Sequence, residues 1–85
     1  MATPEQRERL AQLILALAEA RVSAEAAVEA IQAWTDIPWR ERLMDTGWHL
    51  IYHFEADADI RTSDPKYNVA NREELKRYAA RLRAG

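Results

Sequence analysis

The stretch DTGWHLIYHFEAD, residues 45–57, decides whether this chain is built around one long central helix or two short ones. If the stretch is helical, its large apolar residues gather on one side. The residues that fall within about 60° of Ile51, at roughly 100° per residue, are Met44, Trp48, Phe54 and Ala58. Because this phase is kept across Gly47, the pattern predicts a single helix over residues 38–57, starting at Pro38.

Gly47 is the position at which that helix could break. An interior glycine costs about 1 kcal/mol relative to alanine, and the packing of the large apolar residues that follow it outweighs this cost. Gly47 also falls on the apolar face, where a missing side chain admits a neighbour such as the helix predicted at 24–35. The alternative is a break, with Thr46 capping a second helical piece.

The rest of the chain also favours helices. Its most frequent residues, alanine, arginine, leucine and glutamate, are good helix formers, and only two glycines and three prolines interrupt them. We therefore predict an all-α fold, a small compact bundle that forms a single domain over residues 1–85. The four main helices are expected at about 4–21, 24–35, 38–57 and 72–84, with a short helical turn near 65–69.

Capping residues mark most of these boundaries. Thr3 and Gln6 form a capping-box pattern at the start of the first helix, and Ser23 is the N-cap candidate for the second. Asp64, followed by proline, starts the short helical turn. Asn71 stands three residues before a glutamate and is the expected start of the last helix.

The acidic segment EADADIRTSD, residues 55–64, has no apolar period and is predicted to be a loop. It does not match a calcium-binding loop. Counted from Asp57, Thr62 stands where glycine is required and Asn68 stands where a glutamate closes the site. Asp57 and Asp59 are expected instead to form the rim of a binding surface.

Composition excludes several classes of protein. The chain has no cysteine, so disulfides, thiolate metal sites and cysteine nucleophiles are ruled out. The longest apolar run, residues 13–18, is far shorter than the roughly 20 residues that span a bilayer, and the first residues lack the apolar core of a signal peptide. We expect no membrane partner and a reducing compartment such as the cytoplasm. The net charge of −2 is divided unevenly, with 6 basic and 12 acidic residues in 1–65 but 6 basic and 2 acidic in 66–85.

Asp45, His49, His53 and Asp57 follow one another at a spacing of four, so on a helix they form one row on the polar face. Two histidines four residues apart can bind one metal ion. The zinc-protease pattern, however, needs a glutamate where Leu50 stands. We interpret the row as a solvated helix face and predict no metal or cofactor. A metal site at His49 and His53, or a polar contact with a partner, are the alternatives.

Three tryptophans, Trp34, Trp39 and Trp48, lie close together in the sequence. The simplest interpretation places them at the aromatic centre of the core. The alternative makes Trp39, near a helix start, an exposed anchor for a partner, since tryptophan is enriched at interface hot spots. The predicted central helix is apolar over about 200° of its circumference, which indicates a central position or contact with two neighbours.

The predicted last helix is basic, and Lys76, Arg77 and Arg81 are its candidates for contacting phosphates. Nucleic-acid binding is therefore an alternative function. Glu73 and Glu74 dilute the charge, and basic residues near a helix C-terminus also complement the helix dipole. No helix-turn-helix pattern with a basic recognition helix is present.

No pattern typical of an enzyme occurs in the sequence, neither a nucleophile elbow nor a phosphate-binding glycine loop nor a paired-carboxylate site. We expect a small non-enzymatic protein–protein interaction or regulatory module that binds a larger protein or a second copy of itself. The residues expected to bind the partner are Trp39, His49, Tyr52, His53, Asp57 and Asp59.

Overall fold

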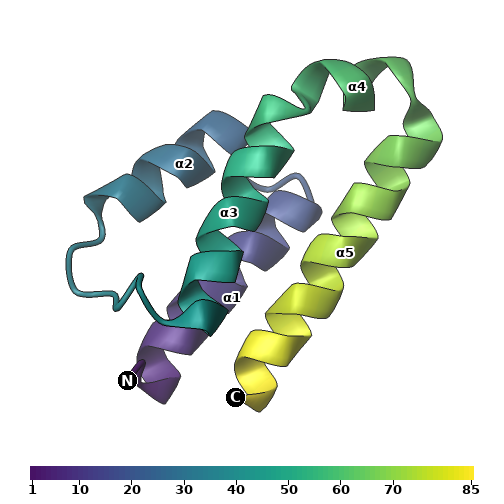
Figure 1. The fold of residues 1–85 in the computed structure, drawn as a ribbon. Coiled ribbons are helices and arrows are strands. Elements are labelled where there is room, and N and C mark those ends of the chain that lie inside the picture. Colours follow the sequence, from purple (N-terminus) through teal and green to yellow (C-terminus); the bar gives the residue numbers. More distant parts are fainter.

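The computed structural model covers residues 1–85 and consists of five helices joined by short connections (Figure 1). They are α1 (Pro4–Ala18), α2 (Ala24–Ala33), α3 (Arg42–Ala56), α4 (Ala58–Ser63) and α5 (Pro65–Ala84). The all-α bundle predicted from the sequence is confirmed. None of the five helices combines the length and the apolar character that crossing a bilayer requires.

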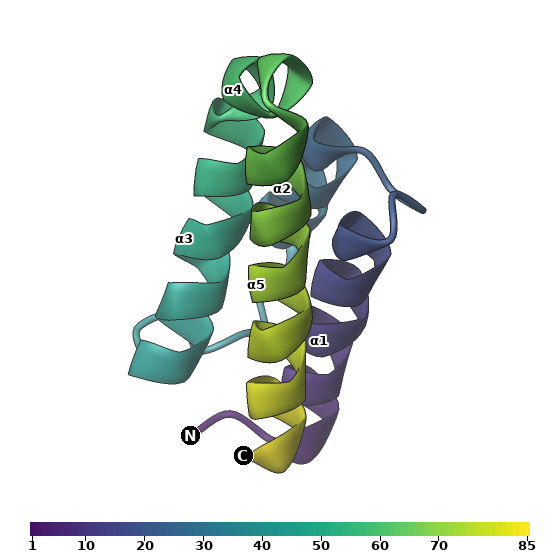
Figure 2. The ribbon, with the colours of Figure 1, turned by 90° about the vertical axis from the view of Figure 1, so that its right-hand side faces the viewer.

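Helices α1 and α5 lie side by side along most of their length, with α3 beside both and α2 on the far side of α3 from α5 (Figures 1 and 2). The short helix α4 turns the chain from the end of α3 into α5. Both ends of the chain lie at the opposite end of the bundle from α4. One cluster of sixteen buried apolar side chains forms the core. The largest fully buried members are Leu10, Ile14, Leu17, Ile31, Met44, Ile51, Leu75 and Leu82.

Helix α3 is unbroken at Gly47, as the apolar phase of the sequence predicted. A Cβ atom added at Gly47 would lie only 2.7 Å from Cδ2 of Leu10 and 3.4 Å from Cε2 of Tyr78. The missing side chain therefore admits α1 and α5. The sequence-based expectation that α2 occupies this space is wrong.

The first helix ends at Ala18, three residues before the predicted end. Ala20 adopts a left-handed conformation with φ of 59°. The amide of Arg21 donates to the carbonyl of Ala16 at 2.8 Å, and the amide of Ala20 to that of Leu17 at 3.2 Å. These bonds form a Schellman motif, which normally has glycine at the left-handed position. Because no glycine occupies this position, the end of the helix could not be predicted from the sequence.

Helix α2 ends earlier than predicted and α3 begins later, so the connection between them is longer than expected. Helix α2 ends at Ala33 because Trp34 is extended, and α3 begins at Arg42 although Pro38 was expected to start it. Glu41 precedes α3 in an extended conformation and makes no cap bond to it. Its carboxylate instead accepts a hydrogen bond from the amide of Ala2 at 2.7 Å. The residue before α3 is thus bonded to the N-terminus of the chain.

Two predictions about the second half of the chain are wrong. The expected acidic loop contains the helix α4, and the expected turn at 65–69 and helix at 72–84 are one continuous helix. Asp64 accepts hydrogen bonds from the amides of Lys66 and Tyr67 and so caps α5, as its place before proline indicated. Asn71 starts no helix because α5 runs through it without interruption.

Gly47→Val tests the close approach of α1 and α3. We expect the substitution to lower the free energy of unfolding by about 2–3 kcal/mol, because the added side chain must displace the buried Leu10. Urea denaturation followed by circular dichroism measures the change. Ala80→Val, at an exposed site in the last two turns of α5, is the control and should cost less than about 1 kcal/mol. Equal losses in the two variants would contradict the packing argument.

Ala20→Gly should stabilise the protein. The left-handed conformation costs an alanine about 1–2 kcal/mol, and glycine removes that cost at the expense of a more flexible unfolded chain. We expect a net gain of about 0.5–1 kcal/mol in the free energy of unfolding, measured by the same denaturation experiment. Ala16→Gly, one turn earlier within α1, is the matched control and should lose about 1 kcal/mol.

Candidate functional site

Four aromatic rings from α3 and from the segment between α2 and α3 form a continuous row, which we name the aromatic surface. The Trp34 and Trp39 rings are stacked with centroids 6.5 Å apart. Trp39 meets Trp48 edge-on at 4.8 Å, and Trp48 stacks against Tyr52 at 5.2 Å. All four side chains are half-buried and pack against the core from outside. The interpretation that the tryptophans form the centre of the core is therefore wrong.

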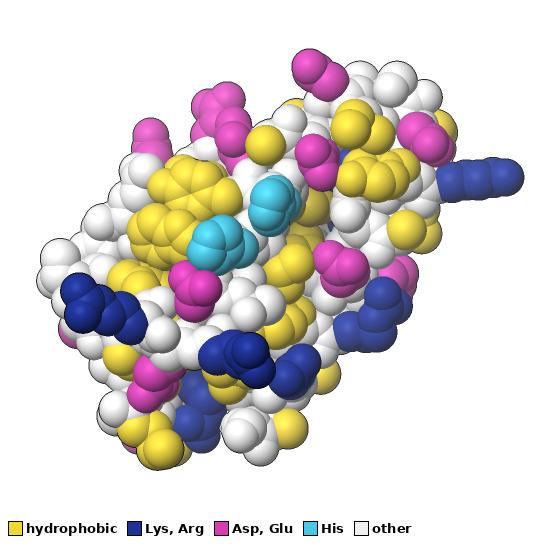
Figure 3. Space-filling view, viewed as in Figure 1, with side chains coloured by type: hydrophobic (Ala, Val, Ile, Leu, Met, Phe, Trp, Pro, Cys, Tyr) yellow, Lys and Arg dark blue, Asp and Glu magenta, His cyan; other side chains and the backbone are white.

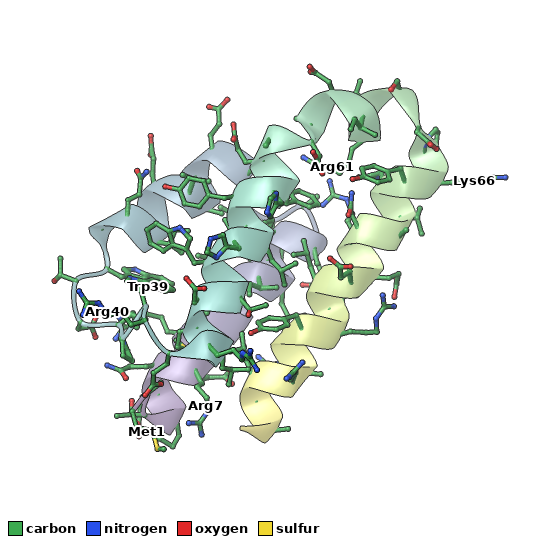
Figure 4. All side chains as sticks on the ribbon, in the orientation of Figure 1. Met1, Arg7, Trp39, Arg40, Arg61 and Lys66 are labelled. Atoms are coloured by element: carbon green, nitrogen blue, oxygen red, sulfur yellow. The ribbon has the colours of Figure 1, made fainter.

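The segment that carries Trp39 is held in place by α1. Arg9 forms two hydrogen bonds with the carboxylate of Asp36, at 2.8 and 3.0 Å, and its guanidinium lies 5.4 Å from the ring centroid of Trp34. The hydrogen bonds from Arg9 lower the pKa of Asp36. Trp39 itself donates from Nε1 to the carbonyl of Trp34 at 3.2 Å. Figure 4 shows Trp39 lying between this segment and α3. The ring is a fixed part of the surface.

His49 and His53 lie beside the aromatic surface on the outward side of α3, and both are exposed. Nδ1 of His49 is 2.8 Å from the carbonyl oxygen of Asp45 and 3.4 Å from its carboxylate, and the two imidazole centroids are 6.4 Å apart. The predicted solvated face is confirmed for these three residues. No group of three or more histidine or acidic side chains comes close enough to hold one metal ion.

Asp57 does not lie in one row with Asp45, His49 and His53, although the spacing predicted that it would. It stands at the junction of α3 and α4, where its carboxylate accepts a hydrogen bond of 2.8 Å from the hydroxyl of Tyr67 in α5. Asp59 is exposed on α4. The structure thus brings Trp39, His49, Tyr52 and His53 to one face, while Asp57 faces α5 instead.

Three further residues belong to this face, although the sequence did not predict them there. Trp34 and Trp48 were assigned to the core, although Trp48 stands four residues before Tyr52 and so shares its side of α3. Gln32 of α2 was not considered, yet its amide donates to the hydroxyl of Tyr52 at 2.5 Å. Figure 3 shows hydrophobic atoms gathered beside the two histidines, with acidic side chains along the edge formed by α2.

The basic residues proposed for nucleic acid do not form one patch. Arg77 and Arg81 line a groove of about 420 Å³ between α3 and α5, together with Leu50 and Tyr78. Lys76 is outside this groove and lies 3.5 Å from a carboxylate oxygen of Glu73. Two of the three predicted residues are therefore brought together.

Comparisons of this chain with models of protein families, with curated proteins and with solved structures found no match. Function is therefore inferred from the arrangement of the chain's own side chains.

We expect Tyr78 to make the free energy of unfolding depend on pH in the alkaline range. Burial raises its pKa, and its hydroxyl donates to the carbonyl of Leu43. A raised pKa means that the fold favours the neutral phenol. The stabilisation is complete below the ordinary pKa of about 10 and is lost as pH rises through the higher folded value. We expect the free energy of unfolding to fall in that range.

Urea titrations between pH 8 and about 11.5 measure this effect. Tyr78→Phe is the control variant, since it keeps the ring but has no proton to lose. It should be less stable at neutral pH and should show a shallower decline above pH 10. The same decline in both proteins would assign the effect to other groups.

Proposed function

We propose that this chain is a small non-enzymatic interaction module that binds a larger protein through the aromatic surface. The observation that supports the proposal is the unbroken row of half-exposed rings from Trp34 to Tyr52. Tryptophan and tyrosine are the residues most enriched at interface hot spots, where they supply large apolar contact area at a low entropic cost. A row of four such rings on one face is unusual among surfaces that meet only water.

The charge around the aromatic surface suggests what kind of segment binds there. Residues 22–59 carry eight acidic and two basic side chains, and two of the acidic ones, Asp36 and Glu41, already pair with Arg9 and with the N-terminal amine. On α2, Glu25 and Glu29 precede Gln32 by helical spacing and therefore lie on the side that faces Tyr52. An acidic edge beside aromatic rings suits a partner segment with an apolar anchor flanked by lysine or arginine. The partner that we propose is a protein with such a basic, apolar segment.

The side chains of the aromatic surface are already held in place before a partner binds. Trp39 is held by its hydrogen bond to Trp34, by stacking on the Trp34 ring and by an edge-on contact with Trp48. Gln32 holds the hydroxyl of Tyr52. Side chains that are already ordered lose little entropy when a partner covers them, which favours affinity. The exposed histidines at the margin of the rings provide polar contacts for the rim.

Tyr52→Ser tests the proposal. The purified chain, immobilised by a tag, is incubated with lysate of the source cells, divided into nuclease-treated and untreated halves, and captured proteins are quantified by mass spectrometry. We expect a protein retained in both halves by the wild-type chain and reduced at least about tenfold by Tyr52→Ser, the size expected for a hot-spot residue. Val69→Ser removes an exposed apolar side chain from α5 and is the matched control, which should capture normally.

Circular dichroism must first show that both variants fold. A partner retained equally by the wild-type chain and by Tyr52→Ser would refute the placement of the interface on the aromatic surface. Loss of all captured protein after nuclease treatment would instead favour nucleic acid and the groove of Arg77 and Arg81. If the chain captures only itself, sedimentation of the wild-type chain and of Tyr52→Ser will show whether the surface joins two copies.

A further inference from the structure

A pocket of about 320 Å³ lies where α1 ends and α2 begins, away from the aromatic surface. Its walls include three arginines, from the turn after α1, from α4 and from α5: Arg21, Arg61 and Arg72. No acidic side chain lines it. We name it the arginine pocket. Its size is within the range of small-molecule sites, which begins at about 300 Å³.

The guanidinium groups of Arg61 and Arg72 both lie close to the aromatic ring of Phe54. Cζ of Arg61 lies 3.4 Å from the ring centroid of Phe54, and Cζ of Arg72 lies 5.2 Å from the same centroid. The attraction of each cation to the ring offsets part of their mutual repulsion. Neither group forms an ion pair with a carboxylate of the chain. The structure thus holds two positive charges together with no carboxylate at ion-pair distance from either.

Main-chain contacts position these two arginines. Arg61 donates to the carbonyl of Phe54, and Figure 4 shows its side chain reaching from α4 back towards α3 and α5. Arg72 donates to the carbonyl of Leu17 at 2.7 Å and to the side chain of Asn68 at 3.0 Å. A guanidinium carries five N–H donors, so each arginine keeps donors beyond those that these bonds use.

Arg21 and the start of α2 complete the positive side of the pocket. Arg21 is exposed and bonds only to Glu19, at 2.7 and 2.8 Å, an exposed ion pair of small energetic value. Ala24, the first residue of α2, is part of the wall, and the positive end of the helix dipole adds to the field there. Arg72 also lines the pocket and adds its positive charge to the electrostatic field there.

The remaining wall is apolar and is formed by Leu17, Val22 and Phe54 among others. The pocket therefore offers two kinds of contact to one molecule. Guanidinium groups bind phosphate and carboxylate oxygens in pairs of parallel hydrogen bonds. We propose that the arginine pocket binds a small organic anion, with its phosphate or carboxylate on the arginines and its apolar part against Phe54, Leu17 and Val22.

Phenyl phosphate is the probe that combines both parts. Titration into the ¹⁵N-labelled full chain, followed by amide chemical shifts, should give saturable changes at Ser23, Ala24 and Phe54 with a Kd below about 10 mM. Inorganic phosphate, which carries the charge alone, and phenol, which carries the ring alone, should each bind at least about tenfold more weakly. Added salt should weaken the binding of phenyl phosphate, since the contact is ionic.

Variants assign the charge to individual arginines. Arg61→Gln should weaken phenyl phosphate about tenfold, and Arg21→Gln about threefold because its side chain is more exposed. Arg77→Gln, in the groove on the other side of α5, is the matched control and should leave the affinity unchanged. If Arg61→Gln does not fold, Arg21→Gln decides alone, since its side chain bonds only to Glu19.

Three results would overturn the proposal. One is the absence of saturable shifts at the pocket residues. Another is equal weakening by Arg77→Gln and Arg21→Gln, which would reveal attraction to the basic half of the chain in general. The third is equal affinity for inorganic phosphate and phenyl phosphate, which would remove the role of Phe54 and its apolar neighbours.

Discussion

The close approach of α3 to α1 at Gly47 is the constraint on which the arrangement of this chain depends. The backbone of α3 rests on Leu10, and Tyr78 of α5 lies against the same point. Once one side of a helix is fixed in this way, the direction of every other side chain follows at about 100° per residue. Tyr52 then faces α2 and Trp48 faces Trp39. The histidines face solvent, and Leu50 faces the groove beside α5.

Much of this fold could be predicted because its information is local. Neighbouring residues determine both the apolar phase across Gly47 and the helix caps. The structure contains that unbroken helix and the predicted caps at Thr3, Ser23 and Asp64. The wrong boundaries have distant or atypical causes. At the start of α3, Glu41 bonds to the N-terminus of the chain instead of capping the helix, and α1 ends just before Ala20, which adopts a conformation that usually selects glycine.

The two candidate sites also differ in whether their residues lie close together in the sequence. Tyr52 and the histidines belong to one helix, so their common face could be read from spacing alone. The arginine pocket could not be anticipated, because Arg21, Arg61 and Arg72 come from three segments that only the tertiary fold brings together. A row of residues along one helix is visible in a sequence, whereas a pocket at the junction of several helix ends is not.

The two sites also differ in their relation to stability. Arg72 donates to carbonyl groups at the end of α1, and Arg61 does the same for α3, so two of the residues that form the pocket also satisfy helix ends. An anion between them would reduce their mutual repulsion and so strengthen both helix ends, since a ligand that binds only the folded state stabilises it. Tyr52 and Phe54 stand about 200° apart around α3. A partner on the aromatic surface therefore leaves the arginine pocket open, and the two sites can be occupied at the same time.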